Sequence, residues 1–75
     1  MIINGIRINL EKVMKEKGYN IGTLAEKAEM HRNGISKIIN GKNNGIEFDT
    51  LDKLCTALDC NVGDIIEHVK NDNPK

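Results

Sequence analysis

The chain has 75 residues, a formal net charge of zero and only two aromatic residues, one Tyr and one Phe. This length excludes a second domain, and the sequence has no run of about 18 apolar residues that would cross a membrane. The first residues, MIINGIRI, lack the pattern of a secretory signal, so we expect a cytoplasmic protein. With so few aromatics, the core must be aliphatic, and binding of single strands by base stacking is disfavoured.

The first predicted elements are a short extended arm and an amphipathic helix. Isoleucines at four positions between residues 2 and 8 partly alternate with polar residues, which is typical of a strand. A second copy of the chain is one candidate to pair with this arm. The helix follows Asn9 as a candidate cap, runs to Lys17 and ends at Gly18, which accepts the left-handed conformation.

Residues 20–41, NIGTLAEKAEMHRNGISKIING, have the pattern of two short helices joined by a tight turn. Asn20 is a candidate cap for a helix over 21–28, and a second helix is predicted over 32–39. Asn40-Gly41 closes the second helix with residue types that accept positive φ. This spacing is that of a helix-turn-helix, and the second helix keeps a polar face formed by His31, Arg32, Asn33, Ser36 and Lys37.

Two more helices are predicted after a polar loop. Asp49 is the expected cap of the fourth helix, with Asp52 three residues on, and its inward stripe is Leu51, Leu54, Cys55 and Leu58. Asn61 with Asp64 repeats the capping pattern for a fifth helix, which carries Val62, Ile65, Ile66 and, towards its end, Val69. The predicted fold is therefore an all-α, compact five-helix bundle with a short extended N-terminal arm. It comprises one domain over residues 1–69 and a flexible tail over 70–75.

Charge is segregated along the chain despite the zero total. Residues 30–46 contain three basic residues and no acidic one, whereas residues 47–67 contain six acidic residues and one basic residue. Zero net charge disfavours non-specific binding to nucleic acid. A protein with one basic surface is then expected to depend on specific contacts and on pairing of subunits for its affinity.

Other functional chemistry finds little support in the sequence. Cys55 and Cys60 lack the His or Cys partners of a zinc site, and we predict reduced thiols that pack as small hydrophobic groups. His68 is expected at the surface. No nucleophile has a base and an orienting group beside it, so we expect no enzyme, no metal, no cofactor and no small-molecule ligand.

The chain resembles the Cro/C1-type helix-turn-helix family, also called the XRE family, over residues 7–67. The motifs that carry the resemblance are LAEK at 24–27, ISKI at 35–38, NGK at 40–42, FDTL at 48–51 and the run from ALDC to GDIIE at 57–67. The resemblance implies a lambda-repressor-like bundle of five helices and sequence-specific binding of double-stranded DNA. The chain departs from the family at Ile21, where Gln is common, and at Glu29, where Gly is frequent.

Candidate DNA contacts follow from the side-chain types on and around the second helix of the motif. Arg and Lys suit guanine and Asn suits adenine in the major groove, so the candidate base-reading residues are Arg32, Asn33 and Lys37. The candidate phosphate contacts are Asn20, Thr23, His31, Ser36, Asn40, Lys42, Asn43 and Asn44. The alternative at each position is structural: a solvated face, a cap at Asn20, a bond within the helix at Ser36, or a soluble loop at 42–44.

These residues predict a transcriptional regulator, expected to be a repressor encoded by a bacterium, a phage or a mobile element. A homodimer is expected because one helix reads only about four to six base pairs. The alternative is a protein-interaction module, antirepressor-like or antitoxin-like, that keeps the fold without binding DNA. Zero net charge, Ile21, Glu29 and the acidic last two helices favour that alternative.

Overall fold

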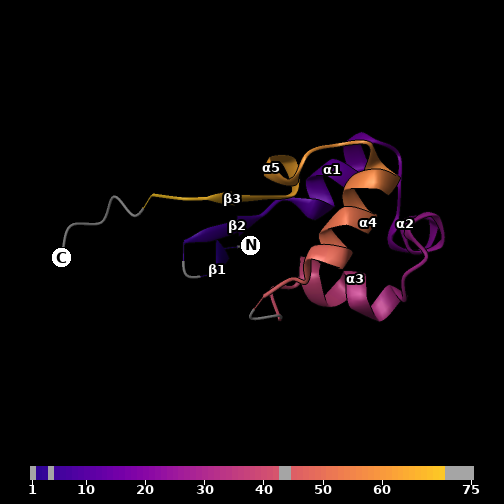
Figure 1. Ribbon diagram of the computed structural model, residues 1–75, viewed down its shortest axis with the longest axis horizontal. Coiled ribbons are helices and arrows are strands. Elements are labelled where there is room, and N and C mark those ends of the chain that lie inside the picture. The colour runs from indigo at the N-terminus through magenta and orange to yellow at the C-terminus, as the bar shows by residue number, and fades with distance from the viewer. Residues whose placement is uncertain (1, 4, 43–44, 71–75) are drawn as a thin grey trace.

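The computed structural model describes residues 2–3, 5–42 and 45–70. The described residues form β1 (Ile2–Ile3), β2 (Ile6–Ile8), α1 (Leu10–Glu16), α2 (Ile21–Ala28), α3 (Arg32–Ile39), α4 (Phe48–Leu58), α5 (Val62–Ile65) and β3 (Ile66–His68). The helices form the body of the molecule, and the strands leave it on one side as a ribbon (Figure 1). Residues 71–75 of the predicted tail lie outside the described residues.

All five helices contribute to one aliphatic core. Its fully buried side chains are Leu10, Leu24, Ile35, Leu54, Leu58 and Ile65. The buried residues of the described chain are all Ile, Leu, Val, Met or Ala, which confirms the predicted composition of the core. Phe48, the first residue of α4, is 89% exposed and takes no part in it.

A three-stranded antiparallel sheet corrects the all-α prediction. β2 is the central strand, with β1 on one side and β3 on the other. Arg7 lies opposite Glu67, and its Nη1 donates to Glu67 Oε2 at 2.9 Å. Ile8 lies opposite Ile66, and both side chains pack against the helical core. The arm is therefore extended as predicted, and within the described chain its partner is β3 of the same molecule.

The fifth helix is shorter than the sequence predicted. It ends at Ile65, and Ile66, which was expected within this helix, is the first residue of β3. Residues 66–68 pair with β2 in an antiparallel register, and this pairing satisfies backbone groups that a further helical turn would otherwise have to satisfy. Val69 continues the ladder, because its backbone N–H donates to the carbonyl of Gly5.

The fourth helix begins one residue before the predicted cap. Its N-cap is Glu47, so the prediction that Asp49 caps the helix is wrong, and Asp49 lies in the first turn. There it pairs with Lys53 at 3.5 Å, one helical turn further on. The inward stripe is as predicted: Leu51, Leu54 and Leu58 are buried, and Cys55 is half-buried and packs against the core.

Candidate nucleic-acid interface

The start of α2 is fixed by a reciprocal cap. The Thr23 backbone N–H donates to Asn20 Oδ1 at 2.8 Å, and the Asn20 backbone N–H donates to Thr23 Oγ1 at 2.9 Å. This confirms Asn20 as the cap of α2. Both residues are exposed, so they stay candidates for phosphate contact at a helix end that favours anions. Ile21, where the family commonly has Gln, packs against the core instead.

The turn between α2 and α3 passes through a left-handed residue. Glu29 has φ +57° and ψ +48°, a conformation that glycine adopts more easily than glutamate. The Met30 backbone N–H then donates to the carbonyl of Ala25 at 2.8 Å, which closes the end of α2. His31 is the N-cap of α3 in an extended conformation, and its side chain makes no capping hydrogen bond. The helix bounds on both sides of this turn are those that the sequence predicted.

The faces of α3 separate core residues from candidate contacts. Ile35 and Ile38 are buried, and Ile39 is half-buried against the core. The helical period places Asn33 and Lys37 on the opposite face, and both are exposed. Their side chains thus lie together on the outward surface of the second helix of the motif.

Two of the candidate phosphate contacts near the end of α3 form a hydrogen bond to each other within the protein. Asn40 Nδ2 donates to Ser36 Oγ at 3.2 Å, so these two side chains lie together one turn apart. Lys42 is exposed, and its backbone N–H donates to the carbonyl of Lys37, which holds it close after the helix. Asn43 and Asn44, the two remaining candidates of this loop, lie outside the described residues.

Arg32 lies apart from the outward pair, at the edge of α3 that faces the start of α2. It borders the same hollow as Asn20, Gly22 and Ile39. Asn33 borders a different hollow with His31 and Lys53. Gly22 and Lys53, which also border these two hollows, are not among the residues predicted from the sequence. Glycine carries no functional group to suggest a role, and Lys53 belongs to an acidic segment distant in sequence.

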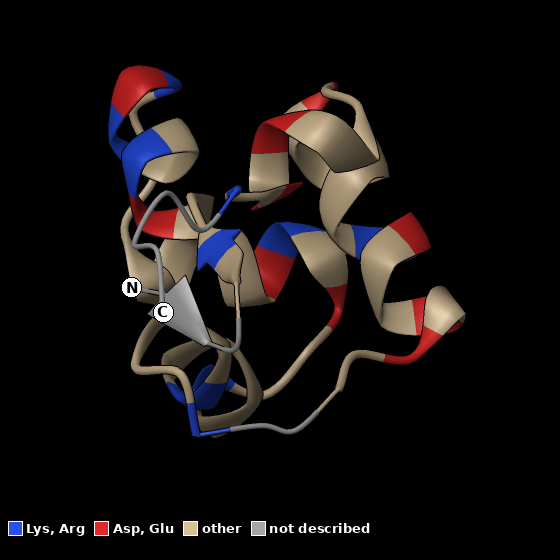
Figure 2. Ribbon diagram, turned by 90° about the vertical axis from the view of Figure 1, so that its left-hand side faces the viewer, with Lys and Arg blue, Asp and Glu red and all other residues tan. Residues whose placement is uncertain are grey.

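Charge around the motif follows the sequence pattern. The ribbon of α3 carries basic segments and no acidic one, whereas acidic segments are spread over other helices (Figure 2). The ion pairs among the described residues are Arg7–Glu67, Lys15–Glu11 and Lys53–Asp49. The basic side chains of α3 therefore have no carboxylate partner within the described chain and remain available to an anion.

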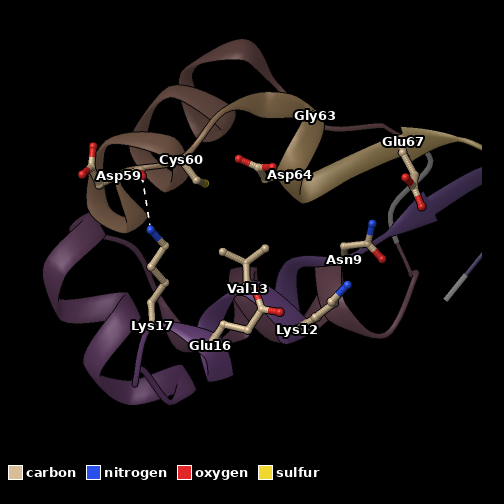
Figure 3. Close-up of a pocket in the computed structure, with 10 residues that line it drawn as sticks. All are labelled: Asn9, Lys12, Val13, Glu16, Lys17, Asp59, Cys60, Gly63, Asp64 and Glu67. Carbon is tan, nitrogen blue, oxygen red and sulfur yellow. Dashed lines mark hydrogen bonds between the residues drawn. The ribbon is translucent and has the colours of Figure 1, made fainter.

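A separate polar cleft lies between α1 and the segment around α5, and no residue of α3 lines it (Figure 3). Its volume is about 370 Å³, and its lining includes both signs of charge; Lys17 Nζ donates across it to the Asp59 carbonyl at 3.4 Å. Cys60 borders it as a free thiol, and partial burial, with Cys55 and Asp64 nearby, raises the pKa of that thiol. No cluster of three metal-ligating side chains occurs among the described residues.

Comparison with known proteins agrees with this geometry. A model of the Cro/C1-type HTH DNA-binding domain matches residues 9–71, and the chain belongs to this family. It is thus a helix-turn-helix protein of the DNA-binding, transcription-regulating class, which is not an enzyme class. It is similar to YozG, an uncharacterised HTH-type transcriptional regulator of Bacillus subtilis strain 168. The identity is 32% over 63 residues, which cover 84% of this chain and 75% of YozG. Within the described chain, no helix is long and apolar enough to cross a membrane.

Proposed function

We propose that this protein is a sequence-specific transcriptional repressor that inserts α3 into the major groove of double-stranded DNA. The observation that carries the proposal is the outward face of α3, where Asn33 and Lys37 are exposed together and unpaired within the described chain. Their side-chain types match the hydrogen-bonding edges of adenine and guanine. Arg32, at the edge of the same helix, is the third base-reading residue of the proposal.

Phosphate contacts flank this face in the proposed complex. Asn20 and Thr23 lie at the start of α2, whose N–H groups favour an anion, and Lys42 follows the end of α3. His31, Ser36 and Asn40 lie between them and supply further short polar groups. Such contacts orient the protein on the duplex without reading its sequence. The loop residues Asn43 and Asn44 complete this proposed set.

We also propose that the protein acts in the cytoplasm as a homodimer. One copy of α3 reads too few base pairs for a useful specificity ratio, and two copies one helical turn apart double the readout. The sheet offers a place for pairing, because β3 bonds to β2 on one side only and its other edge is open in the described chain. An edge strand of this kind accepts a second copy by backbone hydrogen bonds.

The test is selection of binding sites from a random duplex pool at about 0.1 M salt, where non-specific attraction is already partly screened. We expect enrichment of an inverted repeat whose half-sites are separated by about 34 Å, or one helical turn. A single short motif would keep the DNA-binding proposal and contradict the homodimer. Absence of any enriched sequence would contradict DNA readout and favour a protein-interaction module.

A further inference from the structure

Gly22, the second residue of α2, leaves the space that the Arg32 side chain occupies. A Cβ built at this position would lie 2.8 Å from Arg32 Nη2 and 3.1 Å from Arg32 Cζ. It would also lie 3.3 Å from Asn20 Oδ1, the acceptor of the α2 cap. The guanidinium of Arg32 therefore rests directly on the first turn of α2, and any larger residue at position 22 would displace it.

The backbone of Gly22 gives no other reason for a glycine. Gly22 lies within α2 with an ordinary helical conformation, whereas the glycines at 5, 18 and 41 have positive φ. Inside a helix, glycine is less favourable than alanine because it loses more conformational freedom on folding. A glycine at position 22 therefore weakens α2 slightly, and the three atoms nearest to a Cβ at this position belong to Arg32 and Asn20.

We propose that Gly22 is a positioning residue for DNA recognition: its missing side chain lets α2 hold the Arg32 guanidinium at the junction of α2 and α3. This inference rests on the proposed function, because it assigns Arg32 to the contact with DNA. Holding a long, flexible side chain in one place before binding reduces the entropy lost when the contact forms. The neighbouring Ile21 has no polar side chain that could hydrogen-bond to Arg32. The Arg32 guanidinium is therefore held by its contact with the surface of α2 at Gly22.

The experiment compares the wild-type protein with Gly22→Ala, Arg32→Ala and the double variant, using the duplex enriched by the wild type. Gly63→Ala is the matched control, because Gly63 is also the second residue of its helix and a Cβ there meets nothing within 4 Å. The two closest atoms at position 22 belong to the far end of the flexible Arg32 side chain, which can move aside, so Gly22→Ala is expected to fold. The Arg32 Nε–H signal in a proton–nitrogen NMR spectrum reports the guanidinium position without DNA.

The proposal predicts that the Arg32 signal shifts in Gly22→Ala and stays in place in Gly63→Ala. It also predicts about tenfold weaker binding of Gly22→Ala to the duplex, the effect of losing one good base contact. Adding Gly22→Ala to Arg32→Ala should cause no further loss, because the side chain that Gly22 positions is already absent.

Two results would overturn the positioning role while leaving the proposed function intact. One is wild-type affinity in Gly22→Ala beside a clear loss in Arg32→Ala. The other is an equal loss from Gly22→Ala in both backgrounds, which would mean that the added methyl disturbs the start of α2 itself. Failure of the wild type to enrich any duplex would overturn the proposed function and this inference together.

Discussion

Among the residues that the structure describes, two non-glycine residues end helices in the left-handed conformation: Glu29 after α2, with φ +57°, and Asp59 after α4, with φ +53°. This conformation crowds the Cβ of an L-residue against its own backbone. It costs roughly 1 kcal/mol relative to glycine. Glu29 lies in the turn of the motif and Asp59 lies beside the polar cleft near α5, so the two positions share a backbone strain and differ in their surroundings.

Replacement of either residue by glycine should relieve that strain. We expect Glu29→Gly and Asp59→Gly each to raise the free energy of unfolding by about 0.5–1 kcal/mol, measured by urea denaturation. Each variant removes one acidic charge, so Asp59→Gly is the matched control for charge. Only Glu29→Gly should also strengthen DNA binding, because it removes a carboxylate next to the proposed interface. A drop in the stability of Glu29→Gly would show that the turn does not store this strain.

Between elements, the start of α2 and the start of α1 form a natural comparison. Both helices follow an asparagine, but the Asn20 side chain accepts a capping hydrogen bond from Thr23, whereas the Asn9 side chain makes none. Sequence alone predicted both caps, because asparagine favours the N-cap position in general. The structure separates them: the reciprocal partner Thr23 is present in α2, and the backbone of Asn9 donates to Ile65 as the chain leaves β2.

Asn20→Ala should therefore cost about 1 kcal/mol of stability, the usual loss when an N-cap side chain is removed. Asn9→Ala should cost much less, because no capping hydrogen bond is lost. Thermal unfolding of the two variants without DNA checks this difference. Equal losses would contradict the assignment of a side-chain cap to α2 and not to α1.

The elements of the motif could be predicted closely from sequence, whereas the pairing of the two ends of the chain could not. The bounds of α2 and α3 follow from Asn20, from the apolar spacing and from Asn40-Gly41, all of which are local signals. Ile66 lies in a strand because it pairs with β2, which is about 60 residues away in sequence, and no local pattern reveals that pairing. The contact between Gly22 and Arg32 was missed for the same reason, because it joins two helices across the turn.

At the scale of the whole molecule, the sheet joins the two ends of the chain beside the helical body. β2 precedes α1 and β3 follows α5, and their pairing forms a ribbon that projects from the helical body on the side away from α2 (Figure 1). Ile8 and Ile66 extend the core into this ribbon. The two helices that carry the candidate contacts have one face on the core and one face in solvent. Recognition of a DNA groove requires this arrangement.

Zero net charge sets the balance between specific and non-specific binding for the whole protein. Of the proposed phosphate contacts only Lys42 is a Lys or Arg, so affinity for random duplex should be low, and discrimination must come from base contacts on α3. The outward residue Asn33 is assigned to a base and Lys42 to a phosphate. Loss of the two side chains should therefore change binding in different ways.

The most direct measurement is the affinity of the wild type, Asn33→Ala and Lys42→Ala for the enriched duplex and for each of its single-base-pair variants, at about 0.1 M salt. Our account predicts that Asn33→Ala loses discrimination at one defined base pair by about 1–3 kcal/mol. Lys42→Ala should bind all the duplexes more weakly by a similar factor and keep the wild-type preferences. An unchanged preference at every position in Asn33→Ala would contradict the central claim that α3 reads the sequence of the DNA.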